Sequence, residues 1–156
     1  LSIYHLIVKQ ADLFFPVRAL FIPHMTNSLQ KLGLSPSSTP ESRMLSLEIL
    51  STIFKWDERA VQESNKMTDD DSSPLHKQLV WRPPLALRES MISYLMRLAT
   101  MTLEPGQKIA LVPRALSLLQ SMTAPSGWPD VTLGLRFFAR HLEQVCCVAS
   151  VTFHIL

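Results

Sequence analysis

The stretch PESRMLSLEILSTIFKWDERAVQE, residues 40–63, decides the fold class because its apolar residues recur at the spacing of an α-helix. Intervals of four, four and three place one set on a single face: Leu45, Ile49, Ile53 and Trp56. Four more apolar residues widen this stripe: Met44, Leu47, Leu50 and Phe54. We therefore predict a helix that is buried on more than one side. Just before it, Thr39 can act as a cap, Pro40 fits the first turn and Glu41 complements the positive helix end.

A second helix is predicted over residues 17–32. Its apolar residues are spaced by four, four, four and three: Val17, Phe21, Met25, Leu29 and Leu32. Pro23 should bend this helix because it removes one backbone hydrogen bond. Gly33 stands where a glycine commonly ends a helix.

The rest of the chain predicts further short helices, over 1–15, 85–103, 107–122 and after Asp130, which can act as a cap. Pro113 either bends the helix over 107–122 or delays its start. The expected inner faces are Met91, Ile92, Leu95, Leu98, Ala99 and Thr102 in one helix, and Ile109, Val112, Leu116 and Leu119 in the next.

No segment shows a convincing alternation with period two, which a half-buried strand would require. The helix pair over 17–63 has the length of a HEAT or armadillo unit, about 40 to 47 residues. The predicted fold is therefore all-α, a HEAT-like helical repeat (α-solenoid) segment of a larger protein. Apolar residues at both ends, including Ile3 and Phe153, favour that interpretation because terminal repeats need polar caps.

A polar stretch divides the predicted helices into two groups. We expect a helical repeat segment over 1–64, an acidic and polar flexible loop over 65–83, and a second helical repeat segment over 84–156. The loop contains Ser72 and Ser73 beside three aspartates. Added phosphate there could act as a switch, although a solubilising loop is the simpler interpretation.

Composition argues against several classes of partner. Charged residues make up 18% of the chain, and 15 basic against 13 acidic residues give a net charge of +2. No two basic residues are adjacent, so no direct nucleic-acid binding is expected. The two cysteines, Cys146 and Cys147, are adjacent in an apolar stretch, which indicates buried thiols in a reducing compartment. The most apolar run, 145–156, is too short to span a bilayer as a helix, so we expect no membrane contact.

No catalytic, cofactor-binding or metal-binding residue is predicted, and the chain is not expected to be an enzyme. The five histidines are widely spaced, and four glycines leave no phosphate-binding loop. Asp57, Glu58 and Arg59 could suggest an acid pair, but we interpret them as a solvated helix face. Trp56 is expected in the core, while Trp81 and Trp128 should pack over corners between helices.

A family resemblance is carried by two stretches. LFFPVRALFIPHM with NSLQKLGL, within residues 13–34, resembles the helical-repeat region of the TRRAP-type transcription-associated proteins, and residues 40–57 resemble the helix that follows there. These proteins are pseudokinase relatives of the phosphatidylinositol-3-kinase-like kinases, and this variant resembles the fungal members. The resemblance implies a non-catalytic nuclear scaffold, shared by histone acetyltransferase complexes, that docks their protein subunits and transcription activators.

Acidic activation segments would need basic neighbours. The candidates are Arg82, Arg88, Arg97, Lys108 and Arg114, provided that they share a face. An alternative is a HEAT-type scaffold of another large assembly, such as an active kinase relative or a transport adaptor. A stand-alone helical enzyme is a poorer alternative because no polar cluster is legible.

Overall fold

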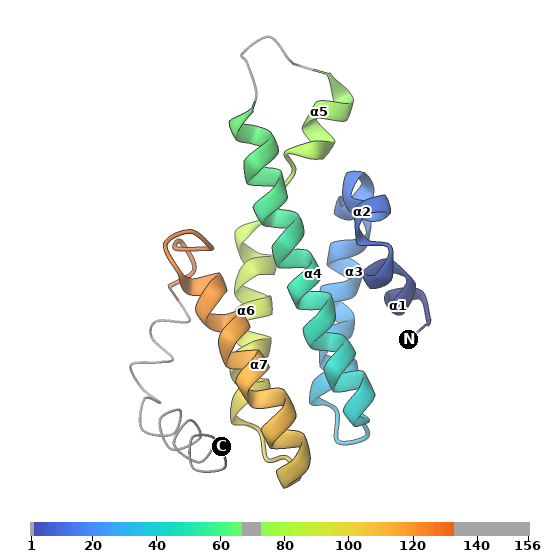
Figure 1. The fold of residues 1–156 in the computed structure, drawn as a ribbon, viewed down its shortest axis with the longest axis vertical. Helices are drawn as coiled ribbons and strands as arrows, with labels where there is room; N and C mark the ends of the chain where they lie inside the picture. The colour runs from blue at the N-terminus through green and yellow to red at the C-terminus, as the bar shows by residue number, and fades with distance from the viewer. Residues whose placement is uncertain (1, 67–72, 133–156) are drawn as a thin grey trace. The chain divides into compact units, whose positions relative to one another are not determined.

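Helix α4, Pro40–Asn65, is the central element of the computed structural model, which describes residues 2–66 and 73–132 (Figure 1). The predicted helix start is confirmed, because the Thr39 hydroxyl accepts a hydrogen bond from the Ser42 N–H and Pro40 begins the first turn. All four residues of the predicted stripe are buried: Leu45, Ile49, Ile53 and Trp56. All secondary-structure elements within the described ranges are helices, which confirms the all-α class.

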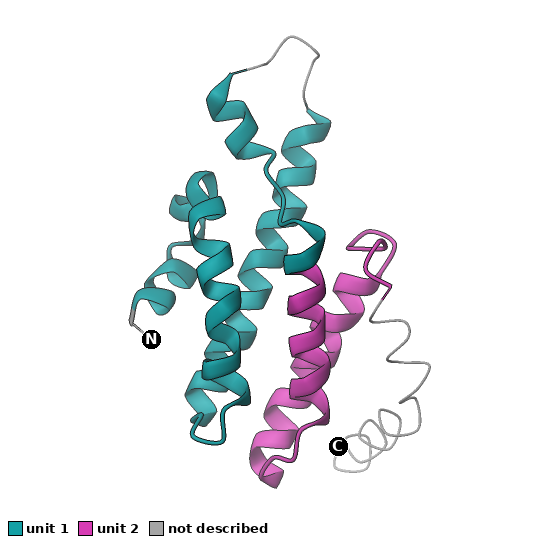
Figure 2. Ribbon diagram, turned by 180° about the vertical axis from the view of Figure 1, so that it is seen from behind, with its two compact units in different colours: residues 1–87 teal, residues 88–156 magenta. Residues whose placement is uncertain are grey.

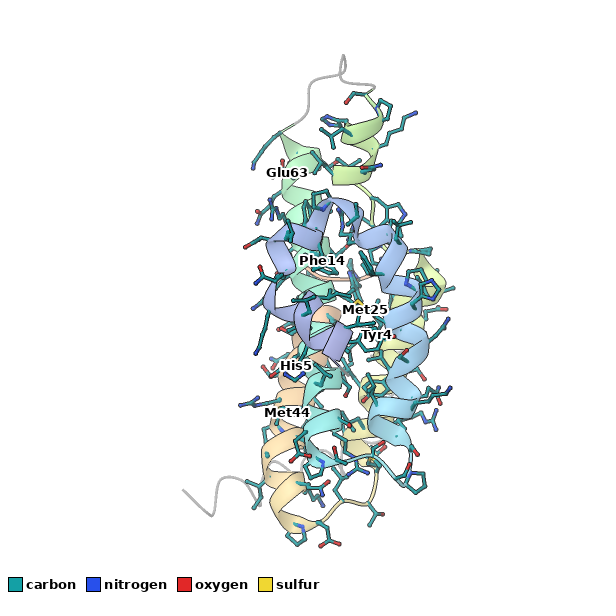
Figure 3. The ribbon with its side chains drawn as sticks, turned by 90° about the vertical axis from the view of Figure 1, so that its right-hand side faces the viewer. Tyr4, His5, Phe14, Met25, Met44 and Glu63 are labelled. Atoms are coloured by element: carbon teal, nitrogen blue, oxygen red, sulfur yellow. The ribbon has the colours of Figure 1, made fainter. Side chains whose placement is uncertain are left out.

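The N-terminal helices pack against one side of α4. They are α1 (Ser2–Lys9), α2 (Ala11–Phe14), the short 3₁₀ helix η1 (Phe15–Val17) and α3 (Arg18–Leu29). Both α1 and α3 contact α4 (Figure 1). Tyr4 of α1 points toward α3 (Figure 3), where its hydroxyl lies 2.6 Å from the Ser28 hydroxyl. The single helix expected over 1–15 is therefore two helices with a break at Gln10.

The buried face of α3 differs from the prediction. Val17 is 40% exposed, whereas Arg18 is 1% exposed and takes the inward position. Three residues per turn in η1 change the phase of the pattern before α3 begins. The buried residues of α3 are then Arg18, Ile22, Met25, Thr26 and Leu29.

Gly33 does not terminate its helix in the expected way. The chain continues after α3 as a π-helix, η2 (Gln30–Leu34), and no described glycine has a positive φ. Gly33 is buried, and its carbonyl accepts a hydrogen bond from Nε of Arg43 at 3.1 Å. A side chain from α4 thus satisfies a carbonyl that a helix end leaves without an intrahelical donor.

Part of the predicted flexible loop is helical. Helix α5, Pro74–Leu79, occupies the later half of 65–83, so the loop prediction is wrong there. The Ser73 hydroxyl caps α5 by accepting from the His76 N–H. Residues 67–72, including Ser72, lie outside the described ranges, and the division into 1–64, 65–83 and 84–156 stays a prediction.

The chain forms two compact units, residues 1–87 and residues 88–156 (Figure 2). Helix α6, Leu85–Thr100, begins in the last residues of unit 1 and leads into unit 2, where α7 spans Pro105–Thr123. Most of the predicted inner faces are buried, but Thr102 follows the end of α6 and Ile109 is exposed. Pro113 lies inside α7, which excludes a delayed helix start.

A tight turn follows α7. The backbone N–H of Gly127 donates to Ala124, and that of Trp128 donates to Met122 at 2.7 Å. The Trp128 side chain is fully buried, as its corner position suggested. Asp130, which was predicted to cap a helix, forms an ion pair with Arg88. The helix expected after Asp130 and the pair Cys146–Cys147 lie outside the described residues.

We predict opposite effects for two glycine substitutions in unit 2. A Cβ at Gly127 would lie 2.5 and 2.6 Å from the backbone oxygens of Ser121 and Met122, so Gly127→Ala should lower the free energy of unfolding by about 1–3 kcal/mol. Gly106 in the first turn of α7 has no such neighbour within 4 Å, so Gly106→Ala should raise it by about 0.4–1 kcal/mol. Urea denaturation of both variants checks this. Equal effects would contradict the described turn.

Candidate functional site

The buried Arg18 side chain donates four hydrogen bonds to backbone carbonyls of unit 1. Its Nη1 donates to the carbonyl of Phe15 at 2.8 Å and to that of Gln78 at 3.0 Å. Its Nη2 donates to the carbonyls of Leu79, at 2.8 Å, and Trp81. The Phe15 carbonyl lies in η1 and also accepts from the Arg18 backbone N–H. The other three acceptors lie in the last turn of α5 and just after it, where carbonyls commonly lack intrahelical donors. One buried guanidinium therefore joins two segments that are 60 residues apart in sequence.

Aromatic rings complete the surroundings of Arg18. The Phe15 ring lies between two guanidinium groups, with Arg18 and Arg59 each 4.1 Å from its centroid. The Trp81 ring centroid lies 5.9 Å from the Arg18 guanidinium. Cations over ring faces are attracted by the ring quadrupole. Trp81 is thus half-buried against a charge and is not a freely exposed docking residue.

The charge of Arg18 is opposed by burial and supported by Asp57. Desolvation lowers the pKa of Arg18 to about 10, Asp57 acts in the opposite direction, and Arg59 lowers the pKa further. A pKa near this value still leaves Arg18 charged at neutral pH. Because folding lowers the pKa, burial of the charge by itself opposes folding, and the four carbonyl acceptors offset that effect.

Asp57 does not belong to a solvated face, which corrects the sequence-based interpretation. It is 3% exposed and accepts two hydrogen bonds from Arg82, from Nε at 2.8 Å and from Nη2 at 2.7 Å. Glu58 and Arg59 are exposed, as expected. The pattern missed Asp57 because its partner, Arg82, lies near the end of the predicted loop and contacts α4 only in the folded chain.

A groove of about 520 Å³ lies in unit 1 between α1–α2 and α4. In Figure 3, α1 and α2 lie in front of α4. The groove lining combines apolar, hydroxyl and charged side chains: Val8, Ala11, Asp12, Glu48, Ser51, Thr52, Lys55, Trp56 and Arg59. At its floor the Trp56 indole N–H donates to the Ala11 carbonyl at 2.9 Å, which fixes α2 on α4. Trp56 is buried, as predicted.

The basic end of the groove is accessible to a ligand. Lys55 is exposed, and its ammonium has no ion-pair partner within the part of the chain that the structure describes. Arg59, one helical turn further along α4, pairs with Asp12 at 3.0 Å, but both side chains are solvent-exposed. Exposed ion pairs contribute little and exchange readily. An incoming carboxylate can therefore replace Asp12 on Arg59 and bind Lys55 as well.

The basic residues proposed from the sequence do not form one described site. Arg82 belongs to unit 1 and pairs with Asp57, whereas the others belong to unit 2, where Arg88 pairs with Asp130 at 2.6 Å. Sequence reasoning missed Lys55 and Arg59 as a site. The sequence shows that these two residues are four apart and so lie on one face of α4. The opposite wall of the groove depends on how α1 and α2 fold onto α4, which the sequence does not show.

Two further kinds of feature were sought among the described residues: groups of metal ligands and membrane-spanning helices. Among them, no three or more His, Cys, Asp or Glu side chains gather in a group that could hold a metal ion. None of the helices described is both long enough and apolar enough to cross a bilayer. The fold of the described residues defines a helical-repeat segment with a groove on its central helix.

Comparison with known proteins identifies the family. The chain belongs to the family described as the Tra1 HEAT repeat ring region, which matches residues 1–152. This finding confirms the TRRAP-type resemblance and the HEAT-like class inferred from the sequence. No solved structure gave a significant match.

Relatives at the sequence level carry consistent names. The SAGA complex/NuA4 acetyltransferase complex subunit Tra1 of Schizosaccharomyces pombe is 28% identical over 145 residues, which is 93% of this chain and 4% of the relative. The corresponding Saccharomyces cerevisiae subunit is 22% identical over 163 residues, covering 90% of this chain and 4% of the relative. The human transformation/transcription domain-associated protein is 33% identical over 69 residues, 44% of this chain and 2% of the relative. The chain thus spans a small fraction of these relatives.

We predict that Asp57→Asn lowers the free energy of unfolding by about 2–4 kcal/mol. The substitution keeps the shape of the side chain but removes the buried negative charge that faces Arg82 and supports Arg18. Asp12→Asn is the matched control, because its carboxylate is fully exposed and its loss should leave stability unchanged. Urea denaturation followed by circular dichroism measures both. Similar midpoints for Asp57→Asn and the unmodified chain would contradict the described network.

Proposed function

We propose that this chain is a non-catalytic scaffold segment of a large nuclear transcription coactivator subunit that is shared by histone acetyltransferase complexes. Family membership over residues 1–152 supports the proposal most strongly, together with the complexes named for the yeast relatives. The net charge of +2 without a basic run supports protein partners over direct contact with nucleic acid. Contact with a membrane is not part of the proposal.

Affinity purification of the full-length protein under native conditions tests this proposal. Mass spectrometry should recover acetyltransferase subunits together with the full-length protein. Recovery of a different machine, such as the partners of an active kinase relative or a transport adaptor, would retain the helical scaffold and refute the transcriptional role.

The groove between α1–α2 and α4 is our proposed docking point for transcription activators. Lys55 and Arg59 offer two cations one helical turn apart, and Val8, Ala11 and Trp56 supply an apolar wall. This combination suits a segment that presents a carboxylate beside an apolar side chain. The pair of cations replaces the earlier set led by Arg82 and Arg88, whose guanidinium groups already bind Asp57 and Asp130.

Glu48 makes the two ends of the groove differ in charge. It lies two helical turns before Lys55, about 10 Å along the helix axis. Its carboxylate repels a second acidic residue at that end, so a uniformly acidic segment should bind less well than one that places an amide or a basic residue there.

Charge reversal at the basic end provides the test. Lys55→Glu combined with Arg59→Glu should weaken binding of a fluorescent peptide rich in Asp and Leu at least tenfold at low salt, because two attractions become repulsions. Fluorescence anisotropy with the full-length protein measures this. Lys31→Glu combined with Lys77→Glu, a reversal of two exposed lysines outside the groove, is the control. Equal binding by both variants would remove the groove as the docking point and leave the scaffold proposal intact.

A further inference from the structure

Unit 1 exposes large apolar side chains on its N-terminal helices. Ile3 is 70% exposed, Leu13 is 71% and Leu20 is 69%, and Leu6 and Val17 are also exposed. We call these five residues the N-terminal apolar surface. They come from α1, α2, η1 and α3, which lie on one side of α4 (Figure 1).

Helix α4, against which these helices pack, exposes polar and charged side chains. In the described chain, α4 has no exposed large apolar side chain along its 26 residues, and its outward positions include Lys55, Glu58 and Arg59. The two other exposed leucines of unit 1, Leu75 and Leu85, lie apart on α5 and at the start of α6. Apolar exposure is therefore concentrated on the N-terminal helices, and such concentrations mark interaction sites.

Two residues of this surface share one helix face. Ile3 and Leu6 are three residues apart on α1, which places them on one face. Leu13, Val17 and Leu20 follow at intervals of four and three, although the bend at η1 separates the first from the last. The five side chains are all aliphatic and suit an apolar helical partner, although the exposed charged residues Lys9 and Asp12 lie between them in sequence.

We propose that the N-terminal apolar surface is the stacking face for the neighbouring helical repeat of the same full-length chain, on the N-terminal side of unit 1. The family is described as a HEAT repeat ring region. The chain covers only 4% of each of the two yeast relatives, so by analogy we expect further repeats in the full-length protein. A single repeat cannot bury its apolar face alone, and in a solenoid each repeat contacts its sequence neighbours. The surface is thereby buried within the chain, and the groove on α4 remains for other proteins.

Site-specific photo-crosslinking in the full-length protein tests this proposal. A benzophenone amino acid replaces Leu13 or, in a second variant, Ile3, and the control variant carries it in place of the exposed Glu58 of α4. After irradiation, mass spectrometry of the peptides should identify adducts with helices that precede residue 1 in the same chain. The expected yield is at least tenfold above that of the Glu58 variant.

Several outcomes would overturn the proposal. Adducts with another subunit would assign the surface to a partner, and adducts between differently isotope-labelled copies would assign it to self-association. A yield equal to that of the Glu58 variant would show that nothing covers the surface. Because the probe replaces exposed side chains, folding should be preserved, and Leu20 provides a third position if one variant fails to accumulate. None of these results depends on whether activators bind the groove.

Discussion

Unit 1 depends on the burial of one positive charge. Arg18 donates hydrogen bonds to carbonyls of η1 and of the segment 78–81, so a single side chain of α3 holds the chain after α5 against the N-terminal helices. A buried guanidinium is unfavourable unless acceptors and opposite charge surround it. Phe15, Trp81 and Asp57 supply those surroundings. The two hydrogen bonds that Arg82 donates to Asp57 attach the segment after α5 to α4 a second time.

Helices and caps could be predicted from the sequence because they depend on local spacing. Contacts between segments that are distant in the sequence could not. The stripe from Leu45 to Trp56 and the cap at Thr39 follow from spacing and local chemistry, and both were confirmed. Arg18 lies outside the predicted apolar stripe, and three of its four acceptors are backbone atoms at least 60 residues away, which no local residue pattern encodes. Gly33 does lie next to the end of its helical segment, but the side chain of Arg43, ten residues further along the chain, satisfies its carbonyl, and the local pattern does not predict that contact.

The structure separates two kinds of surface within unit 1. The N-terminal helices expose apolar side chains that suit permanent contact with further repeats, whereas α4 presents charged and hydroxyl groups beside a groove. A scaffold needs both properties, since its repeats must bury one another while leaving room for partners. The Arg18 network lies next to the groove because Arg59 contacts Phe15 and also lines the groove. A ligand bound to Arg59 would therefore contact a residue that packs on Phe15, next to the Arg18 network.

Hydrogen exchange in the full-length protein tests the central claim most directly. Arg18→Met removes the side-chain donor from four carbonyls, three of them in residues 78–81, which should cost about 3 kcal/mol and accelerate amide exchange in residues 73–82 about 100-fold. Arg59→Met is the matched control, since Arg59 also stacks on Phe15 but binds only the exposed Asp12 among the described residues. Acceleration by Arg18→Met alone is the predicted result. Unchanged exchange in that variant, or equal acceleration by both, would contradict the role assigned to Arg18.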